Sequence, residues 1–487
     1  MALTAYTGVA AFNIGFGAQT AASMFQVFPN AAWKETLDGE RAQKLEDSWA
    51  DVELLIVDET SFIGRALFAR MHFRVQQGKR RFFSELGKDP NKFTFGDISI
   101  LLVGDFGQLE PIDDWSMCDE SARFVDDKRK QHLWKHGQYG KQLLMLFSEA
   151  CLLRKIHCSK EDMWWTQSCL RLRDFEMSYA RDYVHWLEHD LDRGHLTDEQ
   201  KTYFENNAVW LCARSGDVGC RNGRKLARMA EEEKELVHRI ESVHSTRGAR
   251  RLPTSAFAGL RRVVHVVRGC RVMITRNIAY LYGLANGTRG TLVGVVYGEG
   301  GVGSFPEALI VAVEDYCGPC FYEGEPTWVP ILPMTAYKEG TNRSRTQFPL
   351  VAGFALTINK AQGLTIKEGV VIHLAGSPRF RPASKHGLPF VAYTRSESFA
   401  MTAFKNLPPF DDFKKGRDSP MLHQRQEFER KLNELHRKTL ATHSRMRDEK
   451  AEAVEHNKWD ALQAKIAKKR KITPCPMPCP ACDSKWM

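Results

Sequence analysis

The sequence has no long hydrophobic run and no compact cysteine framework. No run of apolar residues approaches the roughly 18–20 that a membrane-spanning helix needs, which excludes an integral membrane protein built on such helices. Met1 is followed by a short apolar stretch with no basic start and no cleavage-type segment, so we expect no secretory signal. The 12 cysteines are scattered along the chain, which favours a reducing compartment over a disulfide-stabilised exterior. We therefore expect an intracellular protein without a membrane partner.

The composition is that of a globular protein with a basic balance. The chain has 487 residues, which predicts about three or four domains at roughly 100–200 residues each. Hydrophobic residues make up 43% and charged residues 26%, a proportion that excludes a fibrous or disordered chain. The net charge of +10 favours polyanionic partners such as nucleic acids, although charge alone is weak support for them.

The first third of the chain alternates short apolar runs with charged helical stretches. The runs Ala2–Ala5, Leu54–Val57 and Ile98–Val103 have the length and composition of buried strands. Between them, Trp33–Trp49 and Phe62–Gly87 have the pattern of amphipathic helices. This alternation predicts βα units around a parallel sheet, so the expected fold class is α/β.

The pattern changes between about residues 263 and 349, where β-branched runs are separated by Gly-rich turns such as Asn286-Gly287. Several short strands joined by such turns predict a small antiparallel β-barrel. An α/β pattern returns over Gly353–His373 and Pro389–Phe404. The stretch Met421–Ile472 has no Gly or Pro and an excess of Lys and Arg, which predicts one long, solvated, basic helix.

Two acidic residues, Asp58 and Glu59, directly follow the apolar run Leu54–Val57. In parallel α/β sheets, ligands bind at the carboxyl ends of the strands. One carboxylate there can hold Mg²⁺ through water, and the next can polarise an attacking water molecule. Alternatively, the pair is only two surface acids at the point where a strand leaves the core.

A second strand, Ile98–Val103, ends in a similar way. It breaks at Gly104 and is followed by Asp105 and Gln108. An uncharged amide can orient a water molecule or sense a γ-phosphate without adding negative charge. A plain strand-to-loop turn would also contain a glycine, but two such strand ends joined by a helical crossover favour a nucleotide site.

These residues, in this order, resemble the Pif and RecD group of superfamily-one DNA helicases. The resemblance extends from about residue 3 to residue 404, and any one of its segments alone would be weak. The segments are similar to motif Ia (Thr4–Ala11 and Gly17–Ser23), motif II (Asp58-Glu59), motif III (Gly104–Pro111, with Phe95-Gly96-Asp97 before it), the start of the inserted barrel (Gly269–Ile274 with Asn277, and Gly283–Gly290), motif V (Phe354–Ile366) and motif VI (Phe390–Arg395).

The resemblance implies two RecA-like domains, at residues 1–148 and at 149–262 plus 350–410, with the barrel inserted at 263–349. A basic helical extension over 411–472 and a disordered Cys/Pro tail over 473–487 would follow. The resemblance also implies an ATP-dependent DNA helicase that uses ATP and Mg²⁺ and translocates 5′ to 3′ on single-stranded DNA. It would unwind duplex junctions in DNA repair, recombination or telomere maintenance. Such a protein is nuclear or mitochondrial in a eukaryote and cytoplasmic otherwise.

The resemblance further implies roles for individual residues. Those implied in catalysis are Asp58 (with Mg²⁺, through water), Glu59, Gln108 and Arg395. Those implied in binding ATP are Gly104, Asp105, Gln362, Gly363 and Arg395. Those implied in binding nucleic acid are Thr4, Thr7, Gly8, Thr20, Asn277, Asn286, Thr357, Asn359 and Lys360. An arginine that reaches a transferring phosphate across a cleft stabilises the charge of the transition state, which is the role implied for Arg395.

The sequence departs from the family in several places. The P-loop, G-x-x-x-x-G-K-[ST], occurs nowhere in the 487 residues, so its lysine, hydroxyl and backbone cradle for phosphates are missing. We expect an incomplete chain rather than a natural P-loop-less protein. Alternatively, the chain is an inactive, nucleic-acid-binding pseudo-helicase, or a protein that acts through its basic helix. Smaller departures are Cys158 where motif IV has an arginine, Asn359 where motif V has a histidine, and Glu110 where motif III has a proline.

Two cysteine patterns suggest other chemistry. Cys317-Gly318-Pro319-Cys320 has the spacing of a thioredoxin motif, but that chemistry needs a helix N-terminus, and the flanks here predict a hairpin turn between strands. Cys475, Cys479 and Cys482 could supply three zinc ligands. Only the last two form a C-x-x-C, and the prolines around them favour a disordered end instead.

Overall fold

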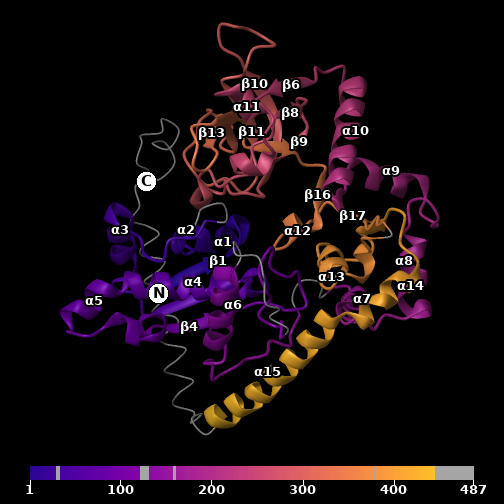
Figure 1. The fold of residues 1–487 in the computed structure, drawn as a ribbon. Coiled ribbons are helices and arrows are strands. Elements are labelled where there is room, and N and C mark those ends of the chain that lie inside the picture. Colours follow the sequence, from indigo (N-terminus) through magenta and orange to yellow (C-terminus); the bar gives the residue numbers. More distant parts are fainter. Residues whose placement is uncertain (29–32, 121–130, 157–160, 378, 445–487) are drawn as a thin grey trace, which may run out of the picture.

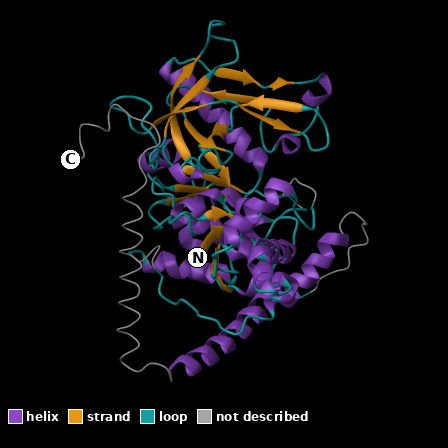
Figure 2. Cartoon of the chain, turned by 90° about the vertical axis from the view of Figure 1, so that its left-hand side faces the viewer, coloured by secondary structure: helices purple, strands orange, loops and turns teal. Residues whose placement is uncertain are grey.

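The computed structural model describes residues 1–28, 33–120, 131–156, 161–377 and 379–444. Its elements form two parallel sheets with helices around them and a β-rich part, which lies uppermost in Figure 1. Figure 2 shows the same division, with most strands in the upper part and helices dominating the lower part. The α/β fold class expected from the sequence is confirmed.

The first sheet is parallel and has the order β2-β1-β3-β4. Its strands are β1 (Ala2–Ala5), β2 (Gln19–Thr20), β3 (Leu54–Asp58) and β4 (Ser99–Leu102). β3 lies between β1 and β4, and its Leu55 and Val57 are fully buried. Within the described residues β4 is an edge strand, and Leu101 on it is 50% exposed. The three apolar runs predicted as strands therefore belong to one parallel sheet.

The helices near the first sheet differ in their limits from the predicted ones. They are α1 (Gly8–Ile14), α2 (Ala21–Met24), α3 (Gly39–Trp49), α4 (Arg65–Gly78), α5 (Arg80–Glu85) and α6 (Gln131–Leu144). The helix predicted from Trp33 begins only at Gly39, because the backbone of Leu37 exchanges two hydrogen bonds with the Gln77 side chain. The helix predicted over Phe62–Gly87 is interrupted at Lys79, whose ammonium group donates to the Ala50 carbonyl 2.9 Å away.

The second sheet is also parallel and has the order β16-β5-β17-β18. Its strands are β5 (Val209–Cys212), β16 (Ala355–Thr357), β17 (Val370–His373) and β18 (Thr402–Phe404). The helices around it are α7 (Met163–Arg173), α8 (Val184–Glu188), α9 (Asp198–Asn206), α10 (Ser215–Glu233), α12 (Ile358–Ala361), α13 (Leu388–Tyr393) and α14 (Phe410–Lys414). Every residue of β5 is buried, as expected for a parallel strand that is covered on both faces.

The β-rich part is antiparallel, as predicted, but it is not a closed barrel. Its largest sheet has the order β12-β11-β10-β9-β15, so β12 and β15 remain edges within the described residues. These strands are β9 (Arg271–Ile274), β10 (Arg289–Val296), β11 (Ala308–Ala312), β12 (Trp328–Ile331) and β15 (Leu350–Ala352). The prediction of a barrel is wrong because other strands of the segment pair elsewhere and do not close this sheet.

The remaining strands pair with segments that precede residue 263. β8 (Val263–Val266) pairs with β6 (His238–Glu241), and β14 (Ser344–Gln347) lies between β13 (Met334–Tyr337) and β7 (Val243–His244). The short helix α11 (Arg247–Arg250) connects these two pairings. The expected boundary between residues 262 and 263 therefore divides strand pairs of the structure, and the domain limits remain a prediction.

The C-terminal helix α15 (Pro420–Ser444) begins where the long helix was predicted, but it is not solvated on all sides. Leu422 is buried in the core of the second sheet, and the Arg425 side chain is fully buried. Phe428 packs edge-on against Phe106, with ring centroids 5.1 Å apart. The prediction of a solvated helix is therefore wrong for this stretch, because its apolar face docks on the folded part (Figure 1). Residues 445–472 of the predicted helix and the 473–487 tail lie outside the described residues.

The described helices include none that is both long enough and apolar enough to span a bilayer. Cys317 and Cys320 lie in the loop between the antiparallel strands β11 and β12, as the hairpin interpretation predicts. The described residues contain no group of His, Cys, Asp and Glu arranged to hold a metal ion, and Cys475, Cys479 and Cys482 lie outside them.

A close helix crossing supports the first sheet and gives a test of the packing. A Cβ at Gly140 in α6 would lie 2.0 Å from the Arg65 carbonyl oxygen of α4. We expect Gly140→Ala to lower the free energy of unfolding by about 1–3 kcal/mol, since the helices must separate. Gly219→Ala in α10 is the control, because its Cβ would meet nothing within 4 Å. It should raise stability by about 0.5–1 kcal/mol in the same denaturant titration.

Candidate functional site

The two carboxylates that follow β3 have an unusual backbone. Glu59 has a φ of 54°, in the left-handed region that residues other than glycine seldom adopt. Its backbone N–H donates to Asp58 Oδ1 over 2.8 Å, which fixes the aspartate beside it. Such strain is found where the surrounding structure enforces it, often at functional sites. The position at the carboxyl end of a central parallel strand is the one predicted from the sequence.

Glu59 meets the predicted motif V glutamine, which comes from the loop after β16. Gln362 Nε2 donates to Glu59 Oε2 over 3.1 Å and to Ser61 Oγ over 3.1 Å. Gln362 is buried, and Gly363 beside it has a φ of 79°. Burial raises the pKa of Glu59 above its usual value, and neighbouring Asp58 adds to the rise while Gln362 opposes it. The structure thus brings two predicted motifs, about 300 residues apart, into one contact.

The loop after β4 lies next to the Glu59 loop. A Cβ at Gly104 would be 2.4 Å from Thr60 Oγ1, so only glycine lets the two loops pack. Gln108 Oε1 is buried and has no hydrogen-bond partner within the described residues. A buried acceptor that is not satisfied is costly unless a ligand or water supplies the donor. Gln108 therefore has the environment expected of a ligand-sensing amide.

Asp105 has a different environment from the one predicted. Its Oδ1 accepts from the Gly107 N–H over 2.8 Å and from Arg173 Nη2 over 2.5 Å. Burial alone would raise the pKa of Asp105, but the hydrogen bonds and charge of Arg173 outweigh it and hold that pKa below its usual value. Asp105 therefore shapes its own loop and holds Arg173, so its carboxylate oxygen is already occupied.

Arg395, the predicted motif VI arginine, donates to its own surroundings. Its Nε and Nη1 donate to the carbonyl oxygens of Val391 and Leu364, each over 2.9 Å, and its Nη2 donates to Thr394 Oγ1 over 3.0 Å. Its positive charge nevertheless acts on Glu59 and opposes the rise in the pKa of that carboxyl. The guanidinium therefore lies within electrostatic reach of the carboxylates and would have to give up some of its present acceptors to donate to a phosphate.

Two of the predicted nucleic-acid contacts, Thr4 and Thr20, have buried hydroxyls that form hydrogen bonds within the chain. Thr4 is 1% exposed, and its Oγ1 donates to the Gln19 carbonyl oxygen. Thr20 is 5% exposed, and its Oγ1 caps α2 by accepting from the Ser23 N–H. Both threonines belong to β1 and β2, where they hold the strand pair and the following turn. The sequence pattern could not distinguish such capping roles from surface contacts.

Other predicted contacts lie on a seam between α1 and the β-rich part. Thr7 caps α1 by accepting from the Ala10 N–H over 3.2 Å. A Cβ at Gly8 would lie 2.3 Å from Asn277 Oδ1, which itself accepts from the Asn286 N–H over 2.9 Å. Both asparagines are exposed, so this seam offers amide groups to solvent.

The remaining predicted contacts surround α12. Thr357 ends β16, Asn359 is half-buried, and Lys360 is exposed. Ile358 and Ala361, on the other face of the helix, are fully buried. The short segment therefore presents a lysine outward while Gln362, directly after it, reaches Glu59.

Sequence reasoning assigned no role to three further residues near this site. Arg173 joins the Asp105 loop to α15, as described below, and no motif marks it. His386 is buried, and its Nδ1 lies 3.6 Å from Oε1 of Glu110, the residue at the family's proline position. Burial raises the pKa of Glu110 and lowers that of His386 to about 3. The unusual glutamate in motif III was the only sequence signal for this pair.

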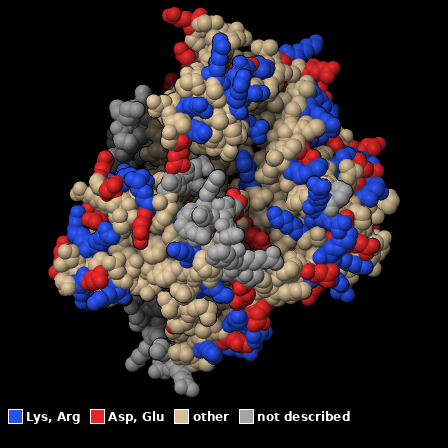
Figure 3. Space-filling view, in the orientation of Figure 1, with Lys and Arg blue, Asp and Glu red and all other residues tan. Residues whose placement is uncertain are grey.

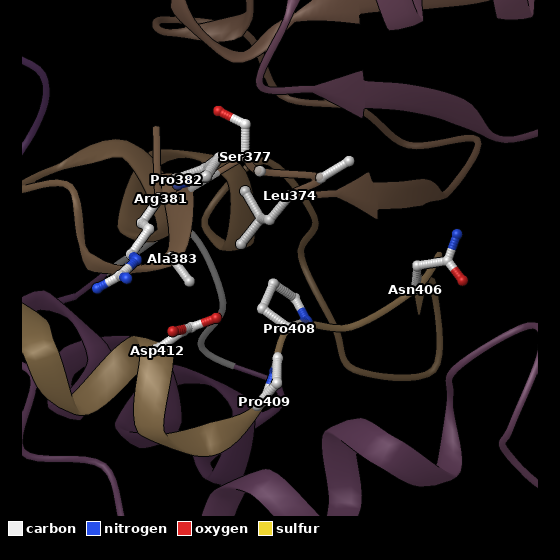
Figure 4. Close-up of a pocket in the computed structure, with 11 residues that line it drawn as sticks. Leu374, Ser377, Arg381, Pro382, Ala383, Asn406, Pro408, Pro409 and Asp412 are labelled. Carbon is white, nitrogen blue, oxygen red and sulfur yellow. The ribbon is translucent and has the colours of Figure 1, made fainter. Parts of the chain in front are cut away.

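One cavity lies away from the predicted site residues. It has a volume of about 390 Å³ at the carboxyl end of β17, and its wall includes Leu374, Arg381, Asn406 and Asp412. Figure 4 shows these side chains around the opening, with Arg381 and Asp412 on the same side. None of the predicted site residues contributes to this wall, so it is separate from the carboxylate site.

Comparison with known sequences agrees with the motifs. The family described as PIF1-like helicase matches residues 1–165. The chain is 25% identical over 365 residues to the ATP-dependent DNA helicase PIF1 of Xenopus laevis, covering 74% of this chain and 49% of that protein. It is 24% identical over 373 residues to the human PIF1 helicase, covering 74% of this chain and 48% of that protein. The chain thus spans about half the length of the curated relatives it matches.

Solved structures share the fold. Pif1 helicase from Candida albicans superposes with a TM-score of 0.61 at 22% identity, covering 89% of this chain and 88% of the other. A Bacteroides Pif1 helicase in complex with ADP-AlF3 and ssDNA gives a TM-score of 0.59 at 19% identity, covering 89% and 87%. The fold is therefore the α/β fold that these Pif1 structures share. The resemblance to the Pif1 type is confirmed by the family match and the curated relatives.

The burial of Glu59 predicts a pH-dependent effect on stability. Glu59→Gln should stabilise the fold at neutral pH, because the amide can still accept from Gln362 without a buried charge. The pKa of Glu59 in the folded protein is raised above its ordinary value of 4.5. The native protein therefore loses stability as the pH rises through the interval from 4.5 to the folded pKa. The gain from Glu59→Gln should therefore be present above that interval and vanish below pH 4.5.

Thermal unfolding across pH measures this gain. Glu40→Gln, at an exposed position in α3, is the matched control and should change little at any pH. A gain for Glu59→Gln that is equal at all pH values would contradict the assignment of a buried charge.

Proposed function

We propose that the chain is the greater part of the motor of an ATP-dependent DNA helicase of the Pif1 type. The observation that carries the proposal is the Glu59–Gln362 contact, because it joins the carboxyl end of β3 to the loop after β16. An ATP-driven motor needs its hydrolytic groups where two parts of the protein meet, so that turnover can move one part against the other.

The residues present would supply the hydrolytic half of an ATP site. Asp58 would hold Mg²⁺ through water, and Glu59 would orient the attacking water. The unsatisfied Gln108 amide oxygen fits a water molecule at the γ-phosphate, and Arg395 lies within electrostatic reach of the same place. Mg²⁺, when bound, would neutralise charge that develops on the phosphates. A P-loop cradle for the triphosphate would have to come from outside these motifs, since the printed 487 residues contain no such sequence.

Single-stranded DNA is the proposed partner, with duplex junctions as the substrate for unwinding. The exposed amides of Asn277 and Asn286 and the exposed ammonium of Lys360 suit contacts to a sugar–phosphate backbone. Figure 3 shows Lys and Arg side chains gathered on the β-rich part, consistent with the net charge of +10. The 5′-to-3′ direction, a role in repair, recombination or telomere maintenance, and a nuclear or mitochondrial location are proposed from the resemblance alone.

The domain limits are proposed as expected from the sequence, with RecA-like domains at 1–148 and at 149–262 plus 350–410. A second candidate function is nucleic-acid binding without hydrolysis. The net charge of +10 supports this alternative, whereas the half-buried and strained Glu59 favours an enzyme.

DNA binding by the chain should not require ATP and should weaken with salt. Bound phosphates release counterions, so the logarithm of affinity for a dT oligonucleotide should fall linearly with the logarithm of salt concentration. Lys360→Ala should reduce the size of that slope by about one. Lys414→Ala, on α14 and remote from α12 in Figure 1, is the control and should keep the slope. Fluorescence anisotropy at several salt concentrations measures the slope for both variants. An affinity that does not change with salt concentration would contradict the proposal.

ATP hydrolysis tests the enzymatic part. The 487-residue chain should hydrolyse ATP slowly at most, and a chimaera with a Pif1 P-loop strand placed before Ala2 should show DNA-stimulated turnover. In that chimaera, Glu59→Gln should abolish turnover and spare ATP binding, whereas Asp58→Asn should weaken Mg²⁺-dependent binding. Arg395→Ala should slow turnover by about 10³-fold or more.

The control for the arginine is Arg239→Ala, an exposed change in β6 that should leave turnover unchanged. Rapid DNA-stimulated hydrolysis by the unmodified chain would show that the missing cradle is not needed. Normal turnover in Arg395→Ala would contradict the assignment of motif VI.

A further inference from the structure

Helix α15 contacts both sheet-bearing parts of the molecule. Near its start, Leu422 packs in the core of the second sheet. Further along, Lys431 pairs with Glu120, and Thr439 Oγ1 accepts from the Ala150 N–H over 3.1 Å. Figure 1 shows the helix running diagonally beneath both parts. The middle of the helix lies against the loop that follows β4, residues 104–111, named here the sensor loop.

Arg173, at the end of α7, links the sensor loop to α15. Its Nε and Nη2 donate to Asp105 Oδ1 over 3.1 and 2.5 Å. The same guanidinium donates to both carboxylate oxygens of Glu429 on α15. One arginine is thus shared by two carboxylates, one on the sensor loop and one on the C-terminal helix.

Arg425 fixes Glu429 from one helical turn away. Its Nη1 lies 3.2 Å from each carboxylate oxygen of Glu429, and its Nη2 donates to Asp174. The Arg425 side chain is fully buried, whereas the three carboxylates are about three-quarters buried. Removing one member of a buried ionic group leaves the others uncompensated, so such groups hold their geometry strongly.

The sensor loop is shaped to receive this arginine. A Cβ at Gly107 would lie 2.2 Å from Arg173 Nε, so the guanidinium lies directly on the loop backbone. Phe106 packs against Phe428 of α15, one position before Glu429. Gln108 follows immediately, so the amide proposed to sense the γ-phosphate lies next to a backbone clamped from two sides.

We propose that Glu429 and Arg425 are positioning residues, which act through Arg173 and Asp105 to fix the sensor loop and hence Gln108. The effect on nucleotide sensing by Gln108 rests on the proposed function. The fixing of the sensor loop by α15, called the clamp below, rests only on the contacts described above. A helix at the far end of the chain would thereby control the geometry of the loop, and displacement of α15 would release it.

Hydrogen–deuterium exchange of the backbone amides in residues 104–111 of the 487-residue chain tests the clamp. Glu429→Gln should speed exchange there by about tenfold. The variant loses roughly one charged hydrogen bond of the closed loop, so the loop opens more often and its amides exchange faster. Glu427→Gln is the matched control, because Glu427 lies on the same helix but is exposed and pairs with Arg430. Its exchange in the sensor loop should match that of the unmodified chain.

Two further variants separate positioning from general support. Leu292→Ala, in the core of the β-rich part and away from α15, should lower the melting temperature without selectively speeding exchange in residues 104–111. In the double variant Asp105→Asn with Glu429→Gln, both changes act through Arg173, so exchange should be no faster than in the faster single variant. If Glu429→Gln does not fold, Arg425→Lys, which keeps the charge and loses the forked donors, carries the same expectation.

Unchanged exchange in Glu429→Gln would overturn the proposal, as would equal acceleration by Leu292→Ala at an equal loss of melting temperature, or additive rates in the double variant. Binding of a dT oligonucleotide is measured alongside. If the unmodified chain does not bind DNA, the helicase proposal fails, but the exchange result still decides whether α15 clamps the loop.

Discussion

The arrangement of the site depends on one contact between two sheets, the hydrogen bond from Gln362 to Glu59. The core around the second sheet extends to Phe62 and Leu109 from the loops of the first sheet, and this hydrogen bond adds a polar contact between the two carboxyl edges. Gln362 is buried and Glu59 is half-buried, which makes the contact costly to break, and Glu59 holds a left-handed backbone at this point. The other site residues, Gln108 and Arg395 among them, are arranged around this junction.

The parts of the fold that the sequence predicted were those decided locally. β1, β3 and β4 are short apolar runs, and burial on a parallel sheet requires little more than such a run. Acidic residues at the end of β3 and a glycine at the end of β4 marked the loops correctly, because the carboxyl edge of a parallel sheet concentrates polar residues. The contact between Glu59 and Gln362 was not predicted, although both residues belong to predicted motifs, because no local pattern contains it.

The rest required pairings that sequence spacing cannot show. The barrel was expected from local turns, yet β7 and β14, about 100 residues apart, take each other as partners. Arg173 and Glu429 are 256 residues apart and lie on helices without any motif, so their ion pair had no sequence signal. Thr4 and Thr20 match a nucleic-acid motif and are nevertheless buried, because a threonine hydroxyl serves equally well as a cap or a strand tie.

The open side of β4 has a consequence for how the protein behaves at high concentration. Within the described residues this strand pairs only with β3, and Leu101 on it and Val103 directly after it are 50% and 36% exposed. A strand edge with free N–H and C=O groups and apolar side chains is a template for any extended segment that meets it. Self-association through β4 would therefore be favoured at the high concentrations used in purification. A lysine at position 101 would make the same edge unattractive to a second chain.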